Sequence, residues 1–140
     1  MRFVTDPLAE LNAWAATKVP GLFGLEITHR GDDGCEGRLT VTEPLIAGTG
    51  YLFAPVVVGV ADVLCAFGMG PGMPEGSSFT TVELKVNFLS SAREGEVVHG
   101  RATQAHAGRT TQVWDCVVTN ETTGRTMALF RNTQLILLAR

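Results

Sequence analysis

Residues 53–69 read FAPVVVGVADVLCAFGM and form the most apolar stretch of the chain. The run is too long for a typical strand, and its apolar side chains point in nearly every direction when it is wound as a helix. We therefore predict a helix buried on all sides, with Pro55 in its first turn and the glycine- and proline-rich residues 68–74 at its end. The apolar stretch from Tyr51 to Met69 approaches the length of a membrane span, but glycines and an aspartate interrupt it, so a core helix is the better interpretation.

Strand-like patterns lie on both sides of this helix. They cover residues 23–28, 36–41, 81–88, 96–104, 111–119 and 126–137. In residues 81–88 polar and apolar side chains alternate, which is typical of a half-buried strand and places Thr81 on its polar face. The later strands are joined by short connections, which favour antiparallel pairing. One helix and about six strands predict an α+β domain in which the sheet curls around the helix.

A short helix is also predicted near the N-terminus. Thr5-Asp6-Pro7 has the pattern of a helix start, and apolar residues then recur at helical spacing as far as Val19. Pro20 and Gly21 are expected to end this helix. The 140 residues contain no linker and no internal repeat, so we expect a single domain over residues 1–140.

Composition and charge argue against several classes of function. The net charge is −3 and the basic residues are scattered, so no surface for nucleic acid is expected. The three cysteines lack zinc or redox spacing and the three histidines lack metal spacing, so we expect reduced thiols and no metal site. The first residues lack the apolar core of a signal peptide, which favours a cytoplasmic protein that does not enter a membrane.

Asp62 is the only charged residue between Glu43 and Glu75, and it lies in the middle of the apolar helix. Burial of a carboxylate is costly, so a fold keeps one where it is hydrogen-bonded, where it opens into a cavity, or where it does chemistry. Position alone leaves two alternatives: a catalytic carboxylate, or a structural one that bonds backbone amides or a partner subunit. Cys65, one turn further on, is expected to be a core thiol because no histidine lies near it in sequence.

Three motifs follow one another along the chain: GYLFAPVVVGVAD at residues 50–62, FTTVELKVNFL at residues 79–89 and GRTTQVWD at residues 108–115. In this order and spacing they resemble the PaaI-like (phenylacetic-acid-degradation type) thioesterases of the hot-dog fold. The resemblance implies an antiparallel sheet wrapped around one long central helix, in agreement with the layout above. It also implies an acyl-CoA thioesterase that needs no cofactor, since CoA is part of the substrate. Homodimers or homotetramers with active sites at subunit interfaces are implied as well.

The resemblance assigns roles to single residues. Asp62 corresponds to the acidic residue of the family, which acts on water as a general base or attacks the thioester as a nucleophile. The backbone N–H of Ala54, at the positive end of the helix, corresponds to the group that polarises the carbonyl. Thr81 corresponds to the hydroxyl that assists the acid, and its place on the polar face suggests that it meets Asp62 only across two subunits. The implied contacts to acyl-CoA are Phe53, Ala47, Phe88, Ser90, Ser91, Arg93, His106, Gly108 and Arg109.

Two positions depart from the family pattern. Phe53 stands where the family usually has histidine, and Ala47 stands where many members have asparagine. Both family residues orient the thioester or the water. Phe53 enlarges the apolar lining, which favours aromatic or medium-chain acyl groups or else weakens activity. A catalytically weak or inactive acyl-CoA or small-ligand binding protein is therefore the alternative function. A hot-dog dehydratase is a third, less favoured possibility, because that reaction needs a catalytic histidine.

Overall fold

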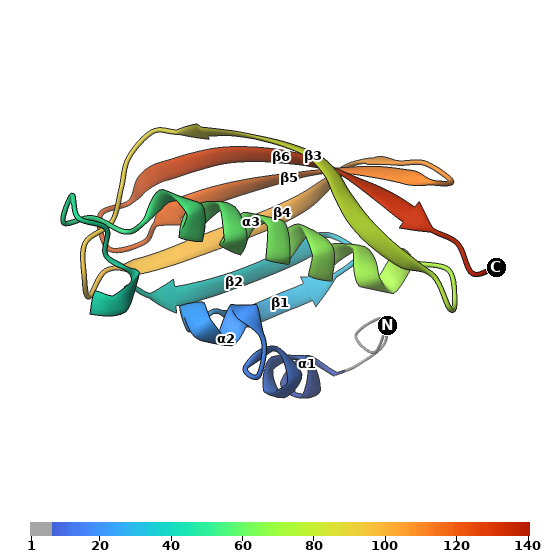
Figure 1. The fold of residues 1–140 in the computed structure, drawn as a ribbon, viewed down its shortest axis with the longest axis horizontal. Coiled ribbons are helices and arrows are strands. Elements are labelled where there is room, and N and C mark those ends of the chain that lie inside the picture. The colour runs from blue at the N-terminus through green and yellow to red at the C-terminus, as the bar shows by residue number, and fades with distance from the viewer. Residues whose placement is uncertain (1–6) are drawn as a thin grey trace.

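Six strands form one antiparallel sheet, and a long helix lies along its concave face (Figure 1). The computed structural model describes residues 7–140. In chain order the elements are α1 (Leu8–Ala15), α2 (Val19–Phe23), β1 (Glu26–Gly31), β2 (Gly34–Thr40), η2 (Glu43–Leu45), α3 (Ala54–Met69), η3 (Gly70–Gly72), β3 (Ser78–Phe88), β4 (Val97–Ala107), β5 (Thr111–Asn120) and β6 (Arg125–Leu137). The predicted α+β architecture, with its central helix and its short N-terminal helix, is confirmed.

The strand order is β1-β2-β4-β5-β6-β3, and every neighbouring pair is antiparallel. Strands β4, β5 and β6 follow one another through short turns. Strand β3 instead runs from the end of α3 to the far edge of the sheet, where it pairs with β6 (Figure 1). Its outer side therefore carries no strand in the part of the chain that the structure describes.

Helix α3 packs on the middle of the sheet, against β2, β4 and β5. Val57, Val60, Ala61 and Leu64 are among its buried residues. The helix comes very close to β4, because a Cβ at Gly100 would lie only 2.4 Å from Leu64 Cδ1. Glycine permits this approach since it has no side chain in the way. The helix is long and apolar enough to span a membrane, but more than half of it is buried in the protein, as the core-helix interpretation expects.

The prediction that α3 is buried on all sides is wrong. Ala54 and Pro55 are exposed. Further along, a stripe of half-buried positions recurs at helical spacing. It consists of Val58, Gly59, Asp62, Val63 and Ala66. The sheet of one chain covers only one side of the helix, so this stripe stays partly open and Asp62 is half-buried rather than enclosed.

The N-terminal region contains two helices where one was predicted. Helix α1 ends at Ala15, and Pro20 and Gly21 lie inside α2 rather than terminating a longer helix. Proline is tolerated there because it occupies the first turn, where its missing N–H is not needed. The Asn12 side chain holds α1 to β1, since its amide bonds both the N–H and the carbonyl of Ile27 at 2.8 Å. The predicted capping residues Thr5 and Asp6 lie outside the described residues.

Candidate active site

The carboxylate of Asp62 lies where α3, β3 and β6 meet. Its Oδ1 accepts a hydrogen bond of 3.0 Å from the Thr81 hydroxyl and one of 2.9 Å from Asn132 Nδ2. Both donors are neutral. Oδ2 has no hydrogen-bond partner within residues 7–140, so one oxygen is fixed while the other remains available. A carboxylate held in this way is suited to act as a base or as a nucleophile.

Thr81 reaches Asp62 within one chain, so the expectation that it needs a second subunit is wrong. The cause is a β-bulge in β3: Thr81 pairs with Gln134 of β6, Glu83 pairs with Thr133, and Val82 between them is the extra residue. A bulge shifts the side-chain alternation by one position. Thr81 therefore shares the helix-facing side of the sheet with Leu84, instead of the opposite side that simple alternation predicted.

A compact loop places Ala47, Phe53 and Ala54 at the start of α3. Ile46 and Leu52 form an isolated antiparallel bridge, and Ala47 closes the turn by donating its N–H to Tyr51 O at 2.8 Å. Phe53 is the N-terminal cap of α3 and its side chain is 51% exposed, so the aromatic ring stands open to an incoming ligand. These predicted residues therefore lie in one loop.

The N–H of Ala54 is an available donor at the positive end of α3. It makes no hydrogen bond within residues 7–140, and Pro55 beside it carries no N–H. Unbonded N–H groups and the helix dipole together favour negative charge at such a place. However, eight positions separate Ala54 from Asp62, which is about 12 Å along the helix axis. One thioester cannot contact both groups of the same chain.

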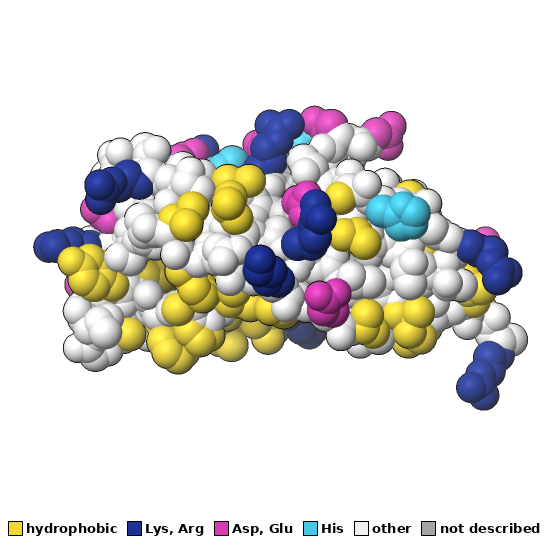
Figure 2. All heavy atoms as spheres, turned by 90° about the horizontal axis from the view of Figure 1, so that it is seen from above, with side chains coloured by type: hydrophobic (Ala, Val, Ile, Leu, Met, Phe, Trp, Pro, Cys, Tyr) yellow, Lys and Arg dark blue, Asp and Glu magenta, His cyan; other side chains and the backbone are white. Residues whose placement is uncertain are grey.

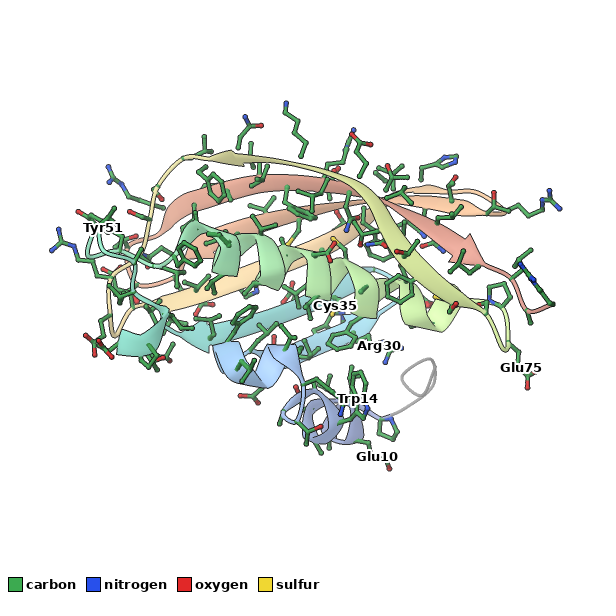
Figure 3. The ribbon with its side chains drawn as sticks, viewed as in Figure 1. Glu10, Trp14, Arg30, Cys35, Tyr51 and Glu75 are labelled. Carbon is green, nitrogen blue, oxygen red and sulfur yellow. The ribbon has the colours of Figure 1, made fainter. Side chains whose placement is uncertain are left out.

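A cavity of about 300 Å³ opens beside this loop. Its lining comprises Tyr51, Leu89, Ser90, Ser91, Arg93, Glu96, Thr123 and Arg125. Leu52 donates its N–H to Ala92 O at 2.8 Å, which joins the loop before α3 to the segment after β3. Figure 3 shows Tyr51 at this end of the molecule, and Glu75 at the other end beyond α3. Ser90, Ser91 and Arg93, three of the predicted contacts to acyl-CoA, thus line the same cavity.

Arg93 is held in place by its neighbours in this cavity. Its guanidinium lies 5.2 Å from the centroid of the Tyr51 ring and donates to the Tyr51 hydroxyl at 3.1 Å. The backbone N–H of Arg93 and the amide of Asn120 both donate to Glu96, and they hold the pKa of that carboxyl below its usual range. No role was predicted from the sequence for Tyr51, although it lies in the motif at residues 50–62, or for Arg125. The cavity joins segments that are far apart in the chain, so no local spacing marks these two residues as neighbours.

The remaining predicted contacts are not all in one place. Phe88 is 49% exposed at the end of β3, next to the cavity residue Leu89. His106, Gly108 and Arg109 lie at or next to the turn after β4. That 11-residue strand starts next to Glu96 and spans roughly 33 Å. In one chain the turn is therefore far from the cavity that contains Arg93.

The three cysteines lie in the core and take no part in this site. All are free and buried. Burial raises the pKa of the Cys65 thiol well above its usual value, and it raises the pKa of Cys35 and Cys116 to about 12. Such thiols are poor nucleophiles. Within residues 7–140 no group of three or more His, Cys, Asp or Glu side chains is placed to hold a metal ion.

A wider hollow, of about 390 Å³, lies over β3, β5 and β6 and contains none of the predicted residues. Lys85, Asp115 and Arg131 line part of it, and the Arg131 guanidinium bonds both oxygens of Asp115 at 2.6 and 2.8 Å. This pairing holds the pKa of Asp115 below its usual range. Since the Asp115 carboxylate and the Arg131 guanidinium already pair with each other, we place the candidate active site at Asp62 and not in this hollow.

The model of the thioesterase superfamily matches residues 49–127, which include both Asp62 and Thr81. This chain belongs to the thioesterase superfamily. A 1,4-dihydroxy-2-naphthoyl-CoA hydrolase of Listeria monocytogenes is 30% identical over 99 residues, which cover 71% of this chain and 80% of that protein. The match supports the predicted family, while the PaaI-like branch stays a prediction.

Solved structures of other proteins share the fold. The crystal structure of a thioesterase from Haemophilus influenzae superposes with a TM-score of 0.87 at 26% identity, over 95% of this chain and 92% of that one. A Streptococcus mutans protein solved with acetyl CoA superposes with a TM-score of 0.74 at 19% identity, over 83% of this chain and 90% of that one. The hot-dog architecture inferred above is therefore confirmed.

Proposed function

We propose that this protein is an acyl-CoA thioesterase that hydrolyses its substrate to a free acid and CoA. The observation that carries the proposal is the Asp62 carboxylate, with Oδ1 fixed by Thr81 and Asn132 and Oδ2 available, in a chain of the thioesterase superfamily. The Listeria relative, which is named 1,4-dihydroxy-2-naphthoyl-CoA hydrolase, supports the same reaction.

In the proposed mechanism Asp62 Oδ2 removes a proton from water, and the oxygen of that water attacks the thioester carbonyl. The N–H of Ala54 stabilises the negative charge that develops on the carbonyl oxygen, and donors of this type typically contribute about 10²–10³ in rate. Collapse of the tetrahedral intermediate breaks the C–S bond, and the CoA thiolate then takes up a proton. Direct attack by Asp62 on the carbonyl, through a mixed anhydride, is the other route that its geometry allows.

We propose that the complete site is shared between two copies of the chain. The separation of about 12 Å between Ala54 and Asp62 along α3 supports this, because one carbonyl must meet both. The edge strand β3 supports it too, since it exposes Val82 at 55%, Leu84 at 42% and Phe88 at 49%. A long apolar edge of this kind is usually covered by another strand. We expect a homodimer or a homotetramer built on this edge.

We propose that the cavity beside Arg93 takes the phosphate-bearing part of CoA. Arg93 and Arg125 supply positive charge, and Ser91 supplies a hydroxyl donor. The Ser90 hydroxyl also lines the cavity, but it donates its proton to Thr126 O at 2.8 Å. In a two-copy site the turn with Gly108 and Arg109, and His106 near the end of β4, would add to this region from the partner subunit. No cofactor or metal is needed for the proposed reaction, and no nucleic acid or membrane partner is proposed. We expect the protein to act in the cytoplasm.

Steady-state hydrolysis of short, medium, long and aromatic acyl-CoA substrates tests the proposal. We expect turnover by the wild type and a fall in kcat of at least about 10²-fold in Asp62→Asn. Leu22→Lys is a matched control, because Leu22 is 78% exposed and lies on α2, outside the elements α3, β3 and β6 that surround Asp62. Full activity in Asp62→Asn would show that the assigned mechanism is wrong.

The exposed Phe53 favours a second candidate, an acyl-CoA binding protein with little or no catalysis. Thermal stabilisation by acyl-CoA without any turnover would favour this alternative. Gain of hydrolysis in Phe53→His would then identify Phe53 as the residue that limits catalysis.

A further inference from the structure

Two buried amides on β6 contact the Asp62 site, and no motif in the sequence pointed to them. Asn132 is 1% exposed and Gln134 is 0% exposed. They are two residues apart on one strand, so their side chains lie on the same face of the sheet. Asn132 Nδ2 donates to Asp62 Oδ1 at 2.9 Å, and the Gln134 amide lies 3.0 Å from the Thr81 hydroxyl.

The protons available to Thr81 fix the direction of this chain of hydrogen bonds. The Thr81 hydroxyl lies 3.0 Å from Asp62 Oδ1 and 3.0 Å from the Gln134 amide, but it has only one proton to donate. An ionised carboxylate can only accept, so Thr81 must donate to Asp62. Gln134 must then present its Nε2–H to Thr81, in the amide orientation related by a half-turn of the side chain. Protons therefore point along one line, from Gln134 to Thr81 to Asp62.

The amides do not satisfy their own hydrogen-bonding needs. As placed, Asn132 Oδ1 and Gln134 Nε2 are buried without a partner among residues 7–140. Rotating the Gln134 side-chain amide by a half-turn gives Nε2 a partner and leaves Oε1 without one. Proteins tolerate a buried carbonyl oxygen without a partner more readily than a buried N–H without one. Burying polar atoms without partners destabilises a fold. A structural role therefore explains these two residues poorly, because apolar side chains would fill the same space at lower cost.

All the side-chain hydrogen bonds that hold Asp62 within residues 7–140 come from β3 and β6. Ala47 and Phe53, in the loop before α3, have no polar side chain to offer. We propose that Asn132 and Gln134 are positioning residues of the thioesterase site: Asn132 holds Oδ1 of Asp62 directly, Gln134 holds it through Thr81, and together they aim Oδ2 at the reacting group. This inference rests on the proposed function and adds to it the residues that orient the carboxylate.

Kinetics of Asn132→Leu and Gln134→Met test the proposal, beside Asp62→Asn as reference. We expect kcat to fall about tenfold or more in each β6 variant, with KM within about threefold of wild type, because the substrate is still bound but the carboxylate is no longer aimed. The melting temperature should stay the same or rise. Unchanged kcat in Asn132→Leu and Gln134→Met, beside a large loss in Asp62→Asn, would overturn the inference and leave the proposed function standing.

Gln112→Met is the matched control. Gln112 is a buried amide directly opposite Gln134 on β5, and it bonds only Trp114 and Gln104 among the described residues. We expect this variant to keep its kcat and to lose thermal stability, since the Trp114 N–H loses its acceptor. Equal losses of kcat in all three amide variants would assign the effect to general disturbance of the sheet and overturn the proposal.

A second measurement needs neither a substrate nor folded β6 variants. The side-chain amide resonances of Asn132, Gln134 and Gln112 are followed by ¹H–¹⁵N NMR in the wild type, Asp62→Ala and Thr81→Val. We expect the Asn132 resonances to move in Asp62→Ala, the Gln134 resonances to move in Thr81→Val, and those of Gln112 to stay in place in both. If the Asn132 and Gln134 resonances did not move, the hydrogen-bond chain would be absent and the proposal wrong, whatever the activity.

Discussion

At Asp62, two neutral donors bind the same oxygen and leave the other without a partner among residues 7–140. A purely structural carboxylate is usually satisfied on both oxygens, since burying an acceptor without a donor is costly. The half-buried position of Asp62 lowers that cost, because one side of α3 is open. The arrangement favours the catalytic interpretation over the structural one that the sequence left open.

Thr81 offers a single-residue test of this arrangement. Thr81→Val keeps the shape and removes the hydroxyl, so Asp62 Oδ1 loses one of its two donors. We expect kcat to fall about tenfold, which corresponds to ~1.4 kcal/mol of transition-state stabilisation. Thr81→Ser restores the hydroxyl and should recover most of the rate. Equal rates in the valine and serine variants would show that the hydroxyl has no part in the reaction.

At the scale of elements, the position of Asp62 depends on how closely α3 approaches β4. Gly100 of β4 lies under Leu64, which is two residues, or about half a helical turn, after Asp62. Because Gly100 has no side chain, nothing separates the helix from the strand at this point. On the far side of the site, the bulge at Val82 turns Thr81 toward the helix. Two local features therefore shape the surroundings of Asp62. Gly100 has no side chain and lets α3 approach the sheet, and Val82 is the extra residue that turns Thr81 toward the helix.

Gly100→Ala tests the close approach of the helix. The added Cβ would lie 2.4 Å from Leu64 Cδ1, so α3 or the Leu64 side chain must move. We expect the free energy of unfolding to fall by about 1–3 kcal/mol, as is typical of overpacking in a core. Gly72→Ala is the control, because nothing lies within 4 Å of the added Cβ there. Denaturant unfolding of both variants provides the comparison, and equal stabilities would contradict the expectation.

The whole molecule has an open side that matches the needs of the proposed site. Hydrophobic side chains gather toward the lower left margin in the view from above, while charged groups are spread over the remainder of that face (Figure 2). The apolar residues of the β3 edge, Val82, Leu84 and Phe88, are exposed on this single chain. Pairing of two copies would cover this edge and supply the second half of a site that α3 alone cannot complete.

Mixing two inactive variants tests a shared site. Asp62→Asn removes the carboxylate, and Ala54→Pro removes the backbone N–H at a position where the preceding Phe53 is already extended, as proline requires. If one subunit supplies the N–H and its partner supplies the carboxylate, each mixed dimer contains one intact site. After unfolding and refolding together, random pairing should restore about a quarter of wild-type activity.

The two variants refolded separately serve as controls and should stay inactive. Light scattering during size exclusion checks that each remains assembled. If the mixture stays inactive although mixed dimers form, the N–H and the carboxylate act within one chain, and the shared site is wrong.

The sequence by itself determined the fold class, the strands and most of α3. The predicted helix over residues 53–69 differs from Ala54–Met69 by one residue, and each of the four later strands was placed within a few positions of its observed limits. Hydrophobic periodicity and breaks at glycine or proline are local properties of the sequence. They can therefore be recognised without knowing which segments pack together in the fold. Asp62 also stood out locally, as one charge in an apolar run.

Only the tertiary structure decided what surrounds Asp62. Its partner Asn132 lies 70 residues away in sequence, and Thr81 faces it because a bulge interrupts the alternation that the sequence pattern suggested. The order of the strands also decides three other features. These are the open side of α3, the position of Arg125 in the cavity, and the distance from Arg93 to the turn after β4. Strand order and register are set by pairing between distant segments, and no local pattern encodes them.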